Sequence, residues 1–133
     1  MRLIRLSVLA AIIALLALAA CSDDDDDKAV NSGNHAPEIL SVTAEPDTFV
    51  AYTEQTTVTA TAQDADGDPL TYSWQMRGSA LQAINSWDNH VELTNCCPVT
   101  ATTSAWVVSL VSDGQGGNAT DSVQVWILPG SGS

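Results

Sequence analysis

The segment Leu70–Met76 reads Leu-Thr-Tyr-Ser-Trp-Gln-Met and decides the fold class of this sequence. Its large apolar side chains alternate with polar ones, which is the period of a β-strand that buries one face. We therefore expect Trp74 in the core between two sheets, with Leu70 and Tyr72 on the same face. Burial of such a side chain contributes roughly 1.5–3 kcal/mol, which a small domain needs for stability.

Short β-type segments recur on both sides of Leu70–Met76. They are separated by turns rich in Asp and Gly, such as Asp66–Pro69 and Asp113–Gly117. No segment after the N-terminal apolar run has the spacing of an amphipathic helix. The further predicted strands are Pro37–Ala44, Thr56–Ala62, Val91–Leu93, Trp106–Val111 and Ser122–Leu128. This pattern predicts an antiparallel β-sandwich over residues 36–129.

Three motifs resemble those of PKD-like, bacterial immunoglobulin-like domains. They are Asn34–Leu40 (NHAPEIL), Gln63–Trp74 (QDADGDPLTYSW) and Val111–Thr120 (VSDGQGGNAT). The resemblance covers residues 36–128 and implies an immunoglobulin-like sandwich of about seven strands, which serves as a binding, spacing or adhesive module of surface and secreted proteins. Trp74 is followed by Gln-Met-Arg, where PKD domains continue with Asp-Phe-Gly-Asp-Gly, so the chain is similar to the looser, cadherin-like edge of this group.

Residues 1–20 have the features of a secretory signal peptide. Arg2 and Arg5 precede an apolar run, Leu6–Ala20, that is shorter than the roughly 20 residues of a membrane-spanning helix. The junction Leu18-Ala-Ala-Cys21 resembles the lipobox of bacterial lipoproteins, in which the Cys is acylated and becomes the first mature residue. This resemblance implies a lipid anchor on Cys21 and a location at the outer membrane of the cell envelope. The alternative is an ordinary signal peptide with an incidental Cys.

Residues 21–35 are predicted to be a disordered acidic tether. Ser22 is followed by five aspartates, and a run of like charges repels itself and does not pack. An acidic run directly after the lipidated Cys resembles a bacterial signal that exports lipoproteins to the outer face of the outer membrane. A solubilising tether that faces the periplasm is the alternative. Residues 130–133 are predicted to be a flexible tail.

The charge of the chain excludes two classes of partner. The formal net charge is −12, and it becomes −14 after removal of Arg2 and Arg5, because all sixteen acidic residues remain. Binding of nucleic acid requires clustered Lys and Arg that neutralise phosphates, and Lys28 and Arg77 cannot supply such a cluster. Anionic lipid surfaces are excluded by the same argument, and cations are the natural counter-ions.

The turn around Gly67 is a candidate calcium site. Asp64, Asp66 and Asp68 place three carboxylates there, and Asp113 is expected at the same end of an immunoglobulin-like sandwich. Ca²⁺ takes six to eight oxygen ligands, which alternate carboxylates supply in part. The alternative is that these aspartates only form turns, since Asp side chains accept hydrogen bonds from nearby backbone amides.

Cys96 and Cys97 are the only cysteines that follow Cys21. An oxidising compartment favours disulfides, but adjacent cysteines can be joined only through a strained ring. A vicinal disulfide, a bond to another molecule and two free thiols all stay open. Pro98 favours the vicinal form, because it predicts a rigid turn.

Catalysis is not predicted. His35 and His90 are the only imidazole bases, and no nucleophile elbow, phosphate-binding loop or HExxH motif is present. Asp88, His90 and Glu92 would share one face of an extended segment and form a weaker candidate site for zinc. A surface histidine among carboxylates is the alternative.

The last two predicted strands carry a candidate binding surface. If Val107 faces the core, the side chains of Trp106, Val108, Leu110 and Trp126 point outward. An exposed stripe of this kind marks a surface for a protein or glycan partner. A β-bulge that buries Trp106 is the alternative.

The sequence thus predicts a non-catalytic interaction module held on the bacterial envelope. The alternative is a structural spacer, stiffened by calcium, with no ligand of its own. A hydrolytic or redox enzyme that uses Cys96 and Cys97 is the least supported of the three.

Overall fold

The computed structural model describes residues 33–78 and 80–130. The predicted signal peptide, Cys21, most of the tether and the last three residues lie outside this range. Among the described residues no helix is long and apolar enough to cross a membrane. The strands are β1 (Glu38–Glu45), β2 (Thr48–Val50), β3 (Thr56–Gln63), β4 (Thr71–Arg77), β5 (Leu81–Trp87), β6 (His90–Asn95), β7 (Thr103–Ser112) and β8 (Asn118–Leu128).

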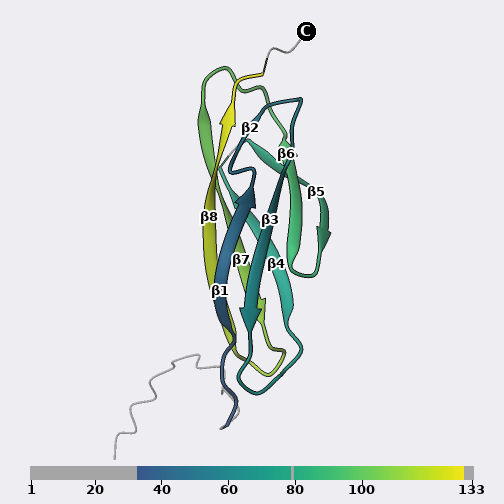
Figure 1. Cartoon of the computed structure of the whole chain (residues 1–133), viewed down its shortest axis with the longest axis vertical. Coiled ribbons are helices and arrows are strands. Elements are labelled where there is room, and N and C mark those ends of the chain that lie inside the picture. Colours follow the sequence, from purple (N-terminus) through teal and green to yellow (C-terminus); the bar gives the residue numbers. More distant parts are fainter. Residues whose placement is uncertain (1–32, 79, 131–133) are drawn as a thin grey trace, which may run out of the picture.

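The strands form two four-stranded sheets, β1-β3-β6-β5 and β2-β8-β7-β4. In Figure 1, β1 and β3 lie in front of β7 and β4. All pairings are antiparallel except that of β2 with β8. This order corresponds to the ABED and GFC sheets of an immunoglobulin sandwich, with β2 as an additional edge strand beside β8. The predicted fold class, an all-β immunoglobulin-like sandwich, is confirmed.

Small and β-branched side chains fill the space between the sheets. Phe49 of β2, Leu93 of β6 and Ile127 of β8 are the largest side chains that are fully buried. The further fully buried aliphatic side chains are Val58, Val91, Val107, Val111 and Val125. Although β2 has only three residues, it contributes the one phenylalanine of the chain to this core.

Trp74 is half-buried, whereas the sequence predicts a fully buried side chain. It packs against the edge of the core together with Met76, and Tyr72 and Leu70 on the same face are also half-buried. The reason is that β4 is an edge strand, so only one of its sides has a neighbouring strand. Trp74 Nε1 and the Oγ of Ser109, which is paired with Trp74 in register, are both buried without a hydrogen-bond partner.

Two strands have no counterpart in the sequence prediction. β2 is too short to show a period, and it pairs with β8 in parallel, so no hairpin turn marks it. β5 is an edge strand with an irregular register between Ala83 and Asn85, and all its residues after Leu81 are exposed. This irregularity removes the alternation on which strand prediction depends.

The loops gather at the two ends of the sandwich. The lower pole, as drawn in Figure 1, consists of residues 33–37 and the loops 64–70 and 113–117. The upper pole consists of the loops 51–55 and 96–102, of Ala80, which is hydrogen-bonded to Cys96, and of residues 129–130. The described chain thus begins at one pole and ends at the other.

We expect that Trp74→Ala lowers the free energy of unfolding by about 3 kcal/mol, the lower end of the range for a buried large aromatic side chain, because Trp74 is half-buried. Trp87→Ala is the matched control. Trp87 is 47% exposed on the other sheet, and its replacement is expected to cost less than about 0.5 kcal/mol. Urea unfolding followed by circular dichroism measures both values. Equal losses in the two variants would contradict the packing of Trp74 against the core.

Candidate functional site

Two aspartates at the lower pole form the turns in which they lie. Oδ1 of Asp64 accepts hydrogen bonds from the backbone N–H of Asp66 at 2.9 Å and of Asp68 at 3.2 Å. Oδ1 of Asp113 accepts from the N–H of Gln115 at 2.7 Å and of Gly117 at 2.9 Å. Each carboxylate therefore supplies acceptors for amides that the turn leaves without a backbone partner.

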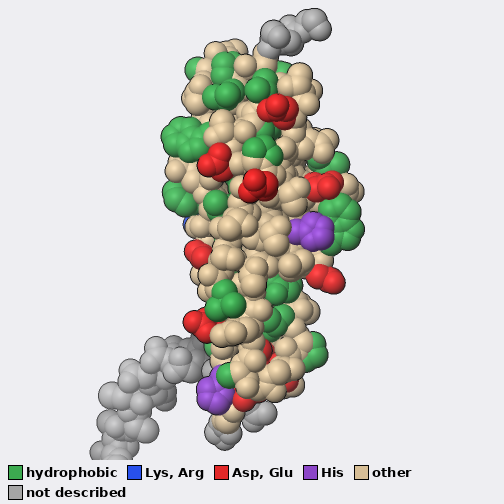
Figure 2. All heavy atoms as spheres, viewed as in Figure 1, with side chains coloured by type: hydrophobic (Ala, Val, Ile, Leu, Met, Phe, Trp, Pro, Cys, Tyr) green, Lys and Arg blue, Asp and Glu red, His purple; other side chains and the backbone are tan. Residues whose placement is uncertain are grey.

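The end of the predicted tether closes over these turns. Asn34 Nδ2 donates to Asp113 Oδ2 at 2.7 Å, and the backbone N–H of His35 donates to Asp66 Oδ2 at 2.6 Å. His35 Nδ1 also lies 3.0 Å from Asp66 Oδ1, and Figure 2 shows a histidine at this pole beside acidic side chains. The sequence predicts Asn34 and His35 as the end of the disordered tether, whereas the structure places both in contact with the folded domain.

A close approach of the backbone completes the closure. A Cβ atom at Gly117 would overlap the carboxylate of Asp113 and the Cα atom of Ala36. Only glycine therefore allows this loop to lie against the segment that leads into β1.

The carboxylates of the lower pole have different electrostatic surroundings. Hydrogen bonds from the backbone and the side chain of His35 lower the pKa of Asp66. Burial and the neighbouring carboxylates, Asp64 first among them, raise the pKa of Asp68. Burial alone would raise the pKa of Asp113, but the hydrogen bonds from Asn34 and the amides of its loop outweigh burial, so this pKa is lowered.

The candidate calcium ligands are brought together only in part. One oxygen of each of Asp64, Asp66 and Asp68 lies within 4.8 Å of the others. These three residues are the one group with such spacing in the described part of the chain. Asp64 Oδ2 is buried without a hydrogen-bond partner. Asp113 lies at the same pole, but both its oxygens accept hydrogen bonds from Asn34 and from its own loop. Three carboxylates are fewer than the six to eight oxygens that Ca²⁺ prefers, so calcium binding stays a prediction.

The candidate zinc ligands are not brought together. The ring of His90 stacks on that of Trp87, with centroids 4.7 Å apart, and Glu92 accepts a hydrogen bond from Asn85. Asp88 is exposed on the turn between β5 and β6. These side chains do not belong to the one group of candidate metal ligands among the described residues.

The outward face of the sheet β2-β8-β7-β4 carries two exposed tryptophans. Trp106 is 47% exposed and Trp126 is 43% exposed. In register, Trp106 pairs with Gln124 and Trp126 pairs with Ser104, so the two indoles stand on adjacent strands at diagonal positions. Diagonal neighbours on one face are about 7–8 Å apart, which lets a single ligand contact both rings.

The predicted apolar stripe is shorter than expected, because Val108 is buried at 8% exposure and Leu110 is half-buried. Strand β7 is flanked on both sides, and Gln75 and Ser122 are paired with Val108 in register. Cross-strand neighbours on the same face stand about 5 Å apart and cover a small side chain between them. The exposed aromatic surface is therefore confined to Trp106 and Trp126.

Arg77, which is paired with Trp106 in register, is the one charged residue among the outward polar residues around these tryptophans. The outward positions are Thr71, Ser73, Gln75 and Arg77 on β4, Ser104 and Ser112 on β7, and Asn118, Thr120, Ser122 and Gln124 on β8. None of them is acidic, in a chain with sixteen acidic residues. Asp47, which directly precedes β2, lies at the margin, where it accepts a hydrogen bond from Thr48. Figure 2 shows acidic side chains spread over the front of the sandwich, where β1 and β3 lie.

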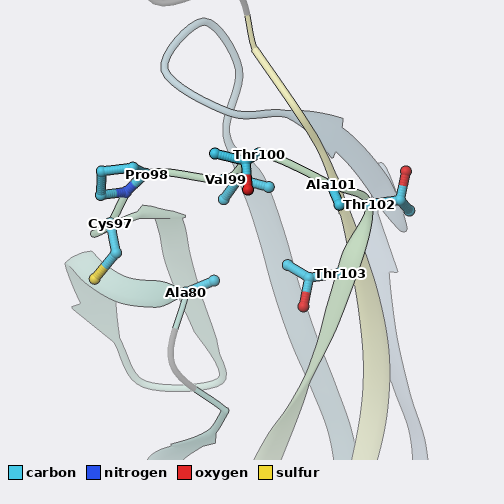
Figure 3. A pocket seen from close by; sticks show the side chains of 8 residues that line it. All are labelled: Ala80, Cys97, Pro98, Val99, Thr100, Ala101, Thr102 and Thr103. Atoms are coloured by element: carbon cyan, nitrogen blue, oxygen red, sulfur yellow. The ribbon is translucent and has the colours of Figure 1, made fainter.

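The structure also contains two depressions that the sequence did not indicate. One of about 380 Å³ lies between the edge strands β4 and β5 and is lined by Leu70, Tyr72 and Trp87, among others. The other, of about 310 Å³, lies at the upper pole beside Cys97 and is formed mainly by the loop 97–103 (Figure 3). The first depression is bordered by β5, whose residues do not alternate, and the second is formed by a loop. The periodicity of the sequence therefore could not locate either depression.

In comparisons with known proteins, the sequence matches no family model and no curated protein.

We expect the stability of the protein to fall as the pH decreases through the lowered pKa values of Asp66 and Asp113. Their contribution is complete above the pKa of the unfolded chain, about 3.9, and is lost on protonation in the folded state. Asp66→Asn should make this acid-side loss smaller, because the pairing with His35 is then absent at every pH. Urea unfolding between pH 7 and pH 2.5 measures the effect.

Asp88→Asn is the control for this experiment, because Asp88 is exposed on the turn between β5 and β6, outside the segments that form the lower pole. Its profile should follow that of the unmodified protein. An unchanged acid-side slope in Asp66→Asn would contradict a role of the His35–Asp66 contact in stability.

Proposed function

We propose that this protein is a non-catalytic interaction module anchored to the bacterial envelope, and that it binds its partner through the outward face of the sheet β2-β8-β7-β4. The observation that carries the proposal is the exposure of Trp106 and Trp126 side by side on a face without acidic side chains.

Two exposed indoles on a regular sheet are suited to binding. Tryptophan offers a large rigid apolar area at little cost in conformational entropy, and it is enriched among residues that dominate binding energies. Trp106 and Trp126 lie on paired strands of a hydrogen-bonded sheet, so their backbone positions are fixed before a partner binds. Binding then costs little ordering of the surface.

The surroundings of the tryptophans favour a glycan over a charged protein partner. Gln75, Gln124 and Ser104 supply amide and hydroxyl groups, and Gln124 Nε2 donates to Ser104 Oγ at 3.0 Å. Such groups exchange hydrogen bonds with sugar hydroxyls, while the indoles cover the apolar faces of sugar rings. The negative charge of the remaining surface repels acidic polymers, which supports an uncharged glycan as the ligand.

The anchor is proposed from the sequence. Cys21 follows an apolar run of signal-peptide length, and the acidic tether separates it from the lower pole. Acylation stabilises membrane association by about 0.8 kcal/mol for each buried methylene group. The tryptophan face lies along the side of the sandwich, so a tether that enters at the lower pole leaves this face accessible.

We expect Cys21→Ala to release the protein from the membrane fraction or to leave it as an unprocessed precursor. The acylated thiol is then absent, while the folded domain is unchanged. Membrane fractionation and the mass of the mature protein measure this outcome. Unaltered processing and membrane association would contradict lipidation at Cys21.

We expect Trp106→Ala and Trp126→Ala each to weaken binding to envelope polysaccharide by at least about tenfold, which is the usual effect at a residue that dominates an interface. Trp87→Ala is the control, because Trp87 has the same exposure as Trp106 but lies on the other sheet. Binding of the purified full chain to a panel of neutral and acidic polysaccharides and to envelope proteins gives the affinities. Equal affinity in all three variants would contradict binding through this face.

A second candidate function is that of a spacer, which the positions of the chain ends favour. The described chain enters at the lower pole and leaves at the upper pole, as a linear array of modules requires. Calcium bound by Asp64, Asp66 and Asp68 would stiffen the joint between tether and domain. A melting temperature that rises with Ca²⁺ and not with Mg²⁺, without any ligand at the tryptophan face, would support the spacer.

A further inference from the structure

Cys96 and Cys97 stand at the start of the loop that joins β6 to β7 at the upper pole. Their Sγ atoms lie 2.7 Å apart, and both side chains are exposed. The direct contact between the two sulfur atoms favours a reaction between them.

Contacts on both sides hold the backbone of the pair in place. Asn95 is only 7% exposed, and its Oδ1 accepts from the N–H of Tyr52 at 2.7 Å while its Nδ2 donates to the carbonyl of Cys97 at 3.2 Å. The N–H of Cys96 donates to the carbonyl of Ala80 at 3.1 Å. Val99 is buried in the core on the other side of the pair. The two thiols are therefore kept close together by these contacts of their backbone, in addition to the contact between the two sulfur atoms.

We propose that Cys96 and Cys97 form a reversible dithiol–disulfide couple, which is oxidised by a disulfide-bearing thiol oxidoreductase or a small disulfide of the envelope. This inference rests on the envelope location in the proposed function, because thiols there meet such oxidants.

The oxidation is a two-step exchange. The thiolate of one cysteine attacks one sulfur of the oxidant, so a mixed disulfide forms as the disulfide of the oxidant breaks and releases a thiol. The other cysteine then loses its proton and attacks the Sγ atom in this mixed disulfide, which forms the Cys96–Cys97 bond and releases the second thiol of the oxidant. Two electrons and two protons pass to the oxidant in total.

The contact with Cys96, and to a lesser extent burial, raises the pKa of the Cys97 thiol, as expected for two thiols in direct contact.

The geometry of neighbouring residues makes this disulfide labile. Adjacent Cα atoms are about 3.8 Å apart, whereas ordinary disulfides join Cα atoms about 4.4–6.8 Å apart. Strained and exposed disulfides are more easily reduced than structural ones. The couple lies at the start of the loop 96–102, most of which lines the depression in Figure 3.

The test uses the purified full chain, first reduced and then equilibrated with oxidised glutathione, with remaining thiols blocked by N-ethylmaleimide. The peptide that contains residues 96 and 97 should lose the mass of two hydrogens, carry no maleimide, and regain two reactive thiols with excess reduced glutathione. Cys96→Ser and Cys97→Ser should each show no such loss and instead form a mixed disulfide with one glutathione. Two glutathiones or two maleimides on this peptide, or a disulfide that links this peptide to a second copy of the chain, would overturn the proposal.

The same peptide from cells, blocked at the moment of lysis, separates the proposal from the proposed function. If the peptide from cells is oxidised, this result supports both the Cys96–Cys97 couple and the envelope location. A couple that forms with glutathione while both cysteines react fully in cells would overturn the envelope location and support the couple itself.

Discussion

Strand β7 pairs with β4 on one side and with β8 on the other. This pairing determines which side chains of the three strands face the core and which face outward. A sheet alternates its side chains between two faces, so one register places Val107 and Val111 in the core and Trp106 on the opposite face. A shift by one residue would exchange these faces and expose the core. The stability of the sandwich and the exposure of its tryptophans are therefore consequences of the same hydrogen-bonded register.

The sequence predicted the fold because the residues of its longer strands alternate. Leu70–Met76 and Ser122–Leu128 each show a period of two, and both segments are strands. The prediction failed where local pattern carries no information. Burial of Trp74 depends on the edge position of β4, which is a property of strand order and not of the strand's own residues. β2 and β5 were missed because one is very short and the other has an irregular register.

For the candidate sites too, features that depend on neighbouring residues in the sequence could be predicted, whereas contacts between distant segments could not. The exposure of Trp106 and Trp126 could be predicted from alternation, and the turns around Asp64 and Asp113 from their Asp-Gly composition. The contacts of Asn34 with Asp113 and of Asn95 with Tyr52 join residues 79 and 43 positions apart. No motif within either segment predicts such a contact, because the partners come together only when the strands assemble into the sandwich.

The parallel pairing of β2 with β8 has a mechanical consequence when the described part of the chain is pulled at its two ends. β2 is reached through β1 from the lower pole, and β8 runs toward the upper pole, so tension between the two ends pulls these strands in opposite directions along their axes. Two backbone hydrogen bonds join them, from the N–H of Trp126 to the carbonyl of Asp47 at 2.8 Å and from the N–H of Ala51 to the carbonyl of Leu128 at 3.0 Å. Under such tension these two bonds bear the load at the same time and not one after another. Phe49, fully buried between these bonds, would have to leave the core before they part. A short strand that adds little to the area of the sheet thus acts as a clamp against extension of the whole module.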